Sequence, residues 1–236
     1  MRKSAVIIVA IVAMFSVFIG YKYYKDDNVV VNENARKFKN EYEALNNKAN
    51  ETNGKKYPFV KVVNESVVKY SSYEEILEVL KTGTGVIYLG YPECPWCRNL
   101  VPIMLSAATE AELDTIYYLN IKEDRDLLML DSNKNIIVEK EGNKKYFQLV
   151  DALDEILDEY VLTDNNGNTV HTGNKRIFVP LLVYVKDGKI IGHHKGTIDA
   201  QDDPYVELTD RQQEELLLDL INNFSIVSGV VCDDAC

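Results

Sequence analysis

The chain has 236 residues, of which 46% are hydrophobic and 27% charged, and its formal net charge is -11 at pH 7. These values are typical of a globular protein with one main domain and some additional segments, long enough to build a core without disulfide cross-links. The acidic balance and the absence of any run of five basic residues argue against a nucleic-acid-binding protein.

The first 25 residues predict a membrane anchor. Arg2 and Lys3 precede an apolar run at residues 5–20, and aromatic and basic side chains follow it at residues 21–24. With these flanks the segment is long enough to span a bilayer as a helix, at about 1.5 Å per residue. A cleaved signal peptide is the alternative, but no small-x-small cleavage site follows the apolar run. We therefore expect a single-pass transmembrane helix over residues 1–25, with the rest of the chain extracytoplasmic.

Residues 26–56 predict a stalk helix followed by a linker. The segment is polar, and Phe38, Tyr42 and Leu45 form its one stripe at helical spacing. The composition changes at Tyr57, soon after an Asn53-Gly54 turn signal. We therefore expect the main domain to occupy residues 57–225, before a cysteine-containing tail at residues 226–236.

Strand and helix patterns alternate through the predicted main domain. The first elements are a valine-rich strand at 62–68, a helix opened by a capping box at Ser71 and Glu74, and a buried strand at 86–89. A helix to about residue 110, a strand at 115–121 and a largely helical insertion at 126–160 follow. The last elements are strands at 178–186 and 189–194, joined by Asp187-Gly188, and a helix from Thr209 to about residue 224. This order predicts an α/β fold with a mixed β-sheet flanked by helices.

Two cysteines stand where the buried strand at 86–89 gives way to a helix. A helix N-terminus lowers the pKa of a thiol through its free N–H groups and dipole, so Cys94 is the predicted nucleophile. Pro95 suits the first helical turn because it has no N–H to satisfy. Cys97, one turn later, is placed to resolve a mixed disulfide at Cys94. Trp96 is expected at the rim, either as a peptide-docking surface or as a partly buried aromatic.

The strand, the Cys-Pro-Trp-Cys motif, the following helix and Val179-Pro180 ahead of a strand hairpin together resemble the thioredoxin superfamily. Within it, the stretch IYLGYPECPWCRNLVPIM is most similar to the bacteriocin-transport accessory proteins, which are exported by Gram-positive bacteria. The resemblance implies a thioredoxin-like fold, a cis peptide bond before Pro180, and thiol–disulfide exchange that needs no cofactor. It also implies a groove for a protein or peptide substrate, lined by Pro95, Trp96, Val179 and Pro180.

One position departs from the thioredoxin pattern. Six residues before the first cysteine, thioredoxins carry a buried aspartate, whereas this chain has Tyr88. The proton acceptor for Cys97 is therefore open. Glu93 is expected to point to solvent, since its charge would otherwise raise the pKa of Cys94, and Lys122 with its neighbour Glu123 offers other proton carriers in a loop.

Cys232 and Cys236 form a second close pair near the end of the chain. They indicate a tail disulfide, a tail without function, or a dithiol that exchanges with Cys94 and Cys97. Four cysteines also suit a tetrahedral zinc site, although the terminal position of the second pair argues against one, and we assign no metal.

We predict a membrane-anchored, extracytoplasmic oxidoreductase that exchanges disulfides with protein thiols. The alternatives are a binding module that assists peptide export, and a zinc-binding domain. The Pro-Trp pair between the cysteines does not determine the direction of electron transfer.

Overall fold

A computed structural model describes residues 32–63 and 66–230 of the chain. Its helices are α2 (Glu33–Glu43), α3 (Tyr73–Thr82), α4 (Pro95–Glu110), α5 (Lys144–Ala152) and α6 (Asp210–Ser228), with a 3-10 turn η1 at Asp154–Ile156. Its strands are β1 (Val68–Tyr70), β2 (Gly85–Gly90), β3 (Ile116–Asn120), β4 (Leu127–Leu130), β5 (Ile136–Lys140), β6 (Asp158–Thr163), β7 (Thr169–Arg176), β8 (Leu181–Lys186) and β9 (Lys189–Lys195).

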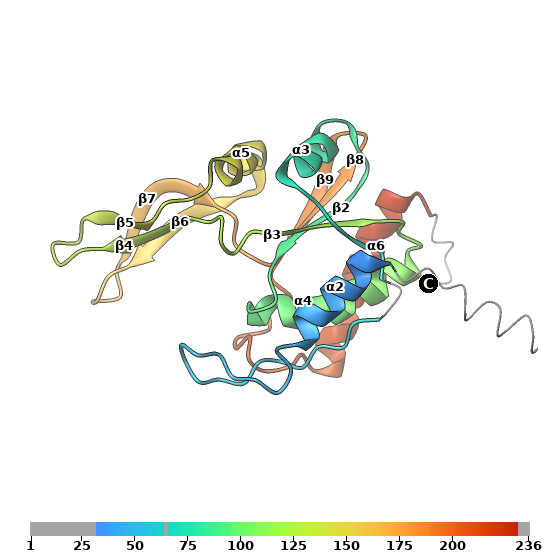
Figure 1. Cartoon of the computed structure of the whole chain (residues 1–236), viewed down its shortest axis with the longest axis horizontal. Coiled ribbons are helices and arrows are strands. Elements are labelled where there is room, and N and C mark those ends of the chain that lie inside the picture. Colours follow the sequence, from blue (N-terminus) through green and yellow to red (C-terminus); the bar gives the residue numbers. More distant parts are fainter. Residues whose placement is uncertain (1–31, 64–65, 231–236) are drawn as a thin grey trace, which may run out of the picture. The chain divides into compact units, whose positions relative to one another are not determined.

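The centre of the fold is a five-stranded mixed sheet with the order β1-β3-β2-β8-β9. β1 and β2 both run parallel to β3, whereas β8 is antiparallel to β2 and to β9. β2 lies in the middle and is buried along its whole length, which explains its continuous apolar run. The predicted α/β class with a mixed sheet is confirmed (Figure 1).

Helices cover both faces of this sheet. Side chains alternate along β2, so Val86 and Tyr88 join a core cluster with α2, α4 and α6, whereas Ile87 and Leu89 join a second cluster with α3 and α5. Figure 1 shows the same two layers on either side of the strands. Because both faces of β2 are covered, the core fixes the start of the segment that leads from β2 to Cys94.

Helix α2, for which the sequence predicts a stalk, is instead part of the core. Phe38 and Tyr42 are fully buried, and the ring of Phe38 lies edge-on to that of Tyr118 at 4.9 Å. The predicted linker is also fixed, since Asn46 exchanges two hydrogen bonds with the backbone of Val60, at 2.7 and 2.9 Å. Three apolar side chains at helical spacing are enough to bury a short helix on an open sheet face.

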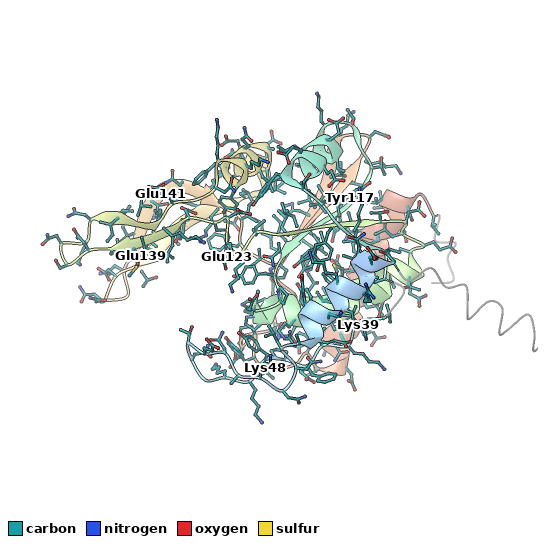
Figure 2. The ribbon with its side chains drawn as sticks, in the orientation of Figure 1. Lys39, Lys48, Tyr117, Glu123, Glu139 and Glu141 are labelled. Atoms are coloured by element: carbon teal, nitrogen blue, oxygen red, sulfur yellow. The ribbon has the colours of Figure 1, made fainter. Side chains whose placement is uncertain are left out.

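The insertion at residues 126–160 contains strands β4 and β5 and the start of β6 as well as helix α5, so the prediction of a largely helical insertion is wrong. Two antiparallel hairpins, β4–β5 and β6–β7, flank helix α5, which contains Leu149 but ends before Leu153. The Ile136-Ile137-Val138 run favours strand because β-branched side chains suit an extended backbone. Asp131 closes the first hairpin by accepting hydrogen bonds from the N–H groups of Asn133 and Asn135, each at 2.8 Å. Figure 2 labels Glu139, which lies in β5 of this hairpin, and Glu141, which follows β5.

Several predicted boundaries are close to those observed. The capping box of α3 is formed by Ser72 and Glu75, one residue later than predicted, and Thr209 caps α6 as expected. Helix α6 continues to Ser228, past the predicted start of the tail at residue 226. The Asp187-Gly188 turn joins β8 to β9, and a Cβ on Gly188 would lie 2.2 Å from the Lys81 carbonyl oxygen.

No helix between residues 32 and 230 of the described chain has the length and apolar character needed to cross a bilayer. The predicted anchor at residues 1–25 lies outside the described residues, as do the first residues of the predicted stalk, Cys232 and Cys236.

Candidate active site

Cys94 is the N-cap residue of α4, where the prediction places it. Its Sγ accepts a hydrogen bond from the backbone N–H of Cys97 at 3.3 Å, and its own N–H donates to the carbonyl of Tyr91 at 3.2 Å. Pro95 is in the first helical turn, where no N–H is lost from the helix. The sulfur therefore takes the position of a capping side-chain oxygen, facing the unpaired N–H groups of the helix.

These contacts act on the pKa of Cys94 in opposite directions. Burial, at 5% exposure, disfavours the thiolate and raises the pKa. Hydrogen bonds from the Cys97 thiol and from the N–H groups of Cys97 and Trp96 stabilise the thiolate, and the charge of Arg125 adds to them. The net result is a pKa for Cys94 below the usual value of a cysteine.

Cys97 has the opposite character. Burial raises its pKa well above the usual value, and the hydrogen bond to Cys94 raises it further. Hydrogen bonds from the Tyr91 backbone and the Tyr88 side chain favour the thiolate but do not outweigh burial. The pair therefore consists of one thiol activated at the helix start and a second, fully buried thiol one turn below it.

The structure brings Val179-Pro180 to the cysteine pair across 85 residues of sequence. The Val179-Pro180 peptide bond is cis, as the resemblance implies. The thiol of Cys94 donates to the carbonyl oxygen of Val179, with a sulfur–oxygen distance of 3.7 Å. Val179 and Trp96 are partly buried against the core, and Phe178, next to Val179, is 43% exposed. Pro180 itself is buried, whereas the resemblance places it in the lining of a substrate groove.

Two charged contacts flank the motif. Glu93, expected to point to solvent, pairs with Lys122 at 2.8 Å. Arg125 donates to the Tyr91 hydroxyl at 2.7 Å, and its guanidinium lies 5.0 Å from the centre of that ring. The first contact compensates the negative charge beside Cys94, and the second holds a positive charge near it.

Tyr88 stands six residues before Cys94, where the resemblance to thioredoxins would lead one to expect a buried aspartate. Its hydroxyl lies 2.6 Å from that of Tyr42, and both side chains belong to the buried core cluster that contains Cys97. Its ring stacks on Tyr118 with 5.3 Å between centroids. Burial, followed by the nearby Cys97 and Tyr118, raises the pKa of Tyr88 well above the usual value, so the phenol stays protonated.

Arg98 is a site residue that sequence reasoning missed. It follows Cys97 directly, yet its side chain is fully buried and donates to the carbonyl oxygens of Tyr42 at 2.7 Å and Pro58 at 2.8 Å. A third hydrogen bond, at 3.4 Å, reaches the carbonyl oxygen of Pro92 in the loop before Cys94. An arginine directly after the motif was the available signal, but most of its partners are distant in sequence.

Within the described ranges, 32–63 and 66–230, no group of three or more His, Cys, Asp or Glu side chains is arranged to hold a metal ion. The predicted alternative of a four-cysteine zinc site includes two cysteines outside those ranges and stays untested.

Comparison of the chain with models of protein families, with curated proteins and with solved structures found no match. The class of protein is therefore defined by its own fold and site. It is an α/β protein whose mixed sheet presents an activated thiol and a buried thiol at the start of one helix.

Proposed function

We propose that the protein is a thioredoxin-like thiol–disulfide oxidoreductase that acts on protein or peptide thiols. The observation that carries the proposal is the position of the Cys94 sulfur. It accepts the Cys97 N–H at 3.3 Å on one side and lies 3.7 Å from the Val179 carbonyl oxygen on the other. A thiol at a helix start, beside a cis X-Pro peptide bond and one turn from a buried thiol, is suited to disulfide exchange.

The sheet supports the same assignment. Parallel strands β1, β3 and β2, followed by the antiparallel β8–β9 hairpin, agree with the mixed sheet expected for a thioredoxin-like domain. The helix after the cysteine pair and the strand after Pro180 also occur in the expected order. The proposed domain includes α2, because its side chains fill the core on the face that carries α4.

The proposed reaction has two steps. The Cys94 thiolate attacks one sulfur of a substrate disulfide, which forms a mixed disulfide and releases the other substrate sulfur as a thiolate. Cys97 then attacks the Cys94 sulfur, which forms the Cys94–Cys97 disulfide and releases the second substrate sulfur. Two electrons pass from the protein to the substrate, and the reverse sequence oxidises a substrate dithiol. Both cysteines belong to the chain, so the exchange uses no cofactor.

The test is to trap the mixed disulfide on the full-length protein. In a Cys97→Ala variant the second step is blocked, so incubation with a disulfide-containing peptide is expected to give a stable adduct at Cys94, detected by mass spectrometry. The matched control is Cys94→Ala, which is expected to give no adduct at Cys97 because that thiol is buried. Equilibration of the unsubstituted protein with glutathione then gives the reduction potential and the direction of electron transfer.

The proposal of thiol–disulfide exchange is overturned if Cys94 forms no adduct and stays unreactive to alkylation near neutral pH. The tail cysteines are excluded as the source of an adduct by repeating the experiment with Cys232→Ser and Cys236→Ser.

A second candidate function is that of a binding module for a polypeptide partner during export. The resemblance of the cysteine motif to that of bacteriocin-transport accessory proteins suggests this role. The exposed aliphatic side chains of the β4–β5 hairpin favour it, among them Met129 at 45% and Val138 at 52% exposure. Export that continues in a Cys94→Ser variant and fails when Met129 and Val138 are replaced by serine would support this role. For either function we propose a membrane-anchored, extracytoplasmic location, based on the apolar run at residues 5–20.

A further inference from the structure

The hydroxyl group of Tyr88 is buried in the core cluster that contains the resolving thiol and a second buried hydroxyl. It lies 2.6 Å from the Tyr42 hydroxyl, and the Tyr88 side chain acts to lower the pKa of Cys97. All three side chains are fully buried. A negative charge that forms on Cys97 is therefore stabilised by protein groups rather than by water.

The Tyr88 ring is fixed in this position from several sides. It stacks on Tyr118 with 5.3 Å between ring centroids, and Phe38 lies edge-on to it at 6.4 Å. Gly90, two residues along the strand, leaves space for the end of the ring, since a Cβ there would lie 2.5 Å from the Tyr88 oxygen. The hydroxyl is held in the same buried cluster as Cys97 before any reaction begins, and a donor fixed in advance is the arrangement that makes a hydrogen bond effective in catalysis.

The second step of the proposed reaction needs such a group. Cys97 begins as a thiol, and negative charge develops on its sulfur as it attacks the mixed disulfide. A carboxylate in the place of Tyr88 would accept the proton of Cys97, whereas a neutral phenol does not take up the proton and instead donates a hydrogen bond to the sulfur as negative charge develops there. The proton of Cys97 then leaves with the departing substrate sulfur, so the step ends with a disulfide and a neutral substrate thiol.

We propose that Tyr88 is a catalytic residue of the second step, which donates a hydrogen bond to the developing Cys97 thiolate while Tyr42 donates to Tyr88. The inference rests on the proposed function and extends it by assigning the group that replaces the carboxylate of thioredoxins. Charge-assisted hydrogen bonds are stronger than neutral ones, so the thiolate gains more from Tyr88 than the thiol does.

The groups that face Cys97 make its titration simple to interpret. They are Cys94 from the motif, Tyr88 from β2, Tyr42 from α2, Tyr118 from β3 and Tyr91 from the loop after β2. Apart from Cys94, each of these described groups is a phenol, which is neutral near neutral pH. A change in the pH dependence of the second step in a Tyr88 variant therefore reports on Cys97.

The test uses the full-length protein with Cys232→Ser and Cys236→Ser, mixed with an aromatic disulfide that releases a coloured thiolate. Attack by Cys94 releases the first thiolate, and attack by Cys97 releases the second, so rapid mixing resolves the two steps. In Tyr88→Phe, the first phase is expected to be unchanged and the second about tenfold to hundredfold slower near pH 7. The midpoint of its pH dependence is expected to move to higher pH.

The matched control is Tyr184→Phe. Tyr184 is also buried in this core cluster, but its hydroxyl has no hydrogen-bond partner among the described residues. Its removal is expected to leave both phases unchanged. Tyr42→Phe keeps Tyr88 in place and is expected to slow only the second phase, by a smaller factor. It also provides the test if Tyr88→Phe does not fold.

The outcomes separate the two proposals. An unsubstituted protein with no first phase overturns the proposed function and this inference with it. A normal first phase with a second phase that Tyr88→Phe leaves unchanged overturns this inference alone. Equal slowing of both phases with no movement of the pH midpoint also overturns it, because that result indicates a structural role for Tyr88.

Discussion

The guanidinium group of Arg98 donates a hydrogen bond to the carbonyl oxygen of Tyr42 at 2.7 Å. Arg98 lies in the helix that carries Cys97, and Tyr42 lies near the end of α2. The same guanidinium donates to the Pro58 carbonyl at 2.8 Å and the Asn46 side chain at 2.7 Å. One buried side chain therefore joins the helix of the cysteine pair to α2 and to the loop that follows it.

Replacement of Arg98 by methionine is expected to destabilise the fold. The apolar chain of methionine fills part of the space, but the carbonyl oxygens of Tyr42 and Pro58 lose this donor, at about 1–3 kcal/mol for each unsatisfied group. The side-chain oxygen of Asn46 keeps only the hydrogen bond from the Val60 N–H. We expect a loss of about 3 kcal/mol or more in the free energy of unfolding, measured by denaturation with urea. The control is Arg211→Met on the exposed side of α6, expected to change stability by less than about 0.5 kcal/mol. Similar small losses in both variants would contradict this role for Arg98.

The reactivity of Cys94 is expected to depend on Cys97. Among the contacts that lower the pKa of Cys94, the hydrogen bond from the Cys97 thiol is the largest, and Cys97→Ala removes it. The lowered pKa means that the thiolate is present at pH values where an ordinary cysteine, with a pKa of about 8.5, is mostly protonated. The pH midpoint for alkylation of Cys94 is expected to lie below that of an ordinary cysteine, and to rise in Cys97→Ala.

This titration is followed by mass spectrometry with iodoacetamide, and Cys94→Ala identifies the reacting thiol. An identical midpoint in the unsubstituted protein and Cys97→Ala would show that the helix N-terminus alone activates Cys94.

Arg125 is expected to contribute a weaker electrostatic effect. Its charge lowers the pKa of Cys94, and the Tyr91 hydroxyl holds it at 2.7 Å. Arg125→Gln is expected to raise the pKa of Cys94 and to slow its alkylation at pH 7, with a smaller effect at high salt because ions screen the charge. Lys140→Gln removes a positive charge elsewhere on the insertion, from a pair with Glu123, and serves as the control. Equal slowing in both variants would mean that net charge, rather than the position of Arg125, is responsible.

Gly90 is expected to tolerate no side chain because of Tyr88. A Cβ at Gly90 would lie 2.5 Å from the Tyr88 oxygen and 2.6 Å from the ring carbon that bears it. Gly90→Ala is expected to cost about 1–3 kcal/mol in the free energy of unfolding, as overpacked cores do. Removal of the oxygen relieves part of this clash, so the double variant with Tyr88→Phe is expected to be more stable than the sum of the two single effects predicts. Additive effects in thermal denaturation would contradict this packing.

The sequence alone was sufficient for features that depend on neighbouring residues. The placement of Cys94 at a helix start follows from the apolar run before it and from Pro95 after it. The Thr209 cap and the Asp187-Gly188 turn follow from short-range hydrogen bonding and from backbone freedom at glycine. The mixed sheet follows from the order of such elements, because an α/β domain must cover both faces of its sheet.

Other features required the tertiary structure. The Ile136-Ile137-Val138 run is a strand because β4 pairs with it. The helical spacing of apolar residues later in the insertion led to the prediction of a helix there instead. The local sequence around Tyr42 fits a stalk helix as well as a helix of the core. Only the sheet face against which this helix packs decides that it belongs to the core. The partners of Tyr88 and Arg98 are 46 and 56 residues away in the chain, so their roles at the cysteine pair depend on long-range packing that no local pattern encodes.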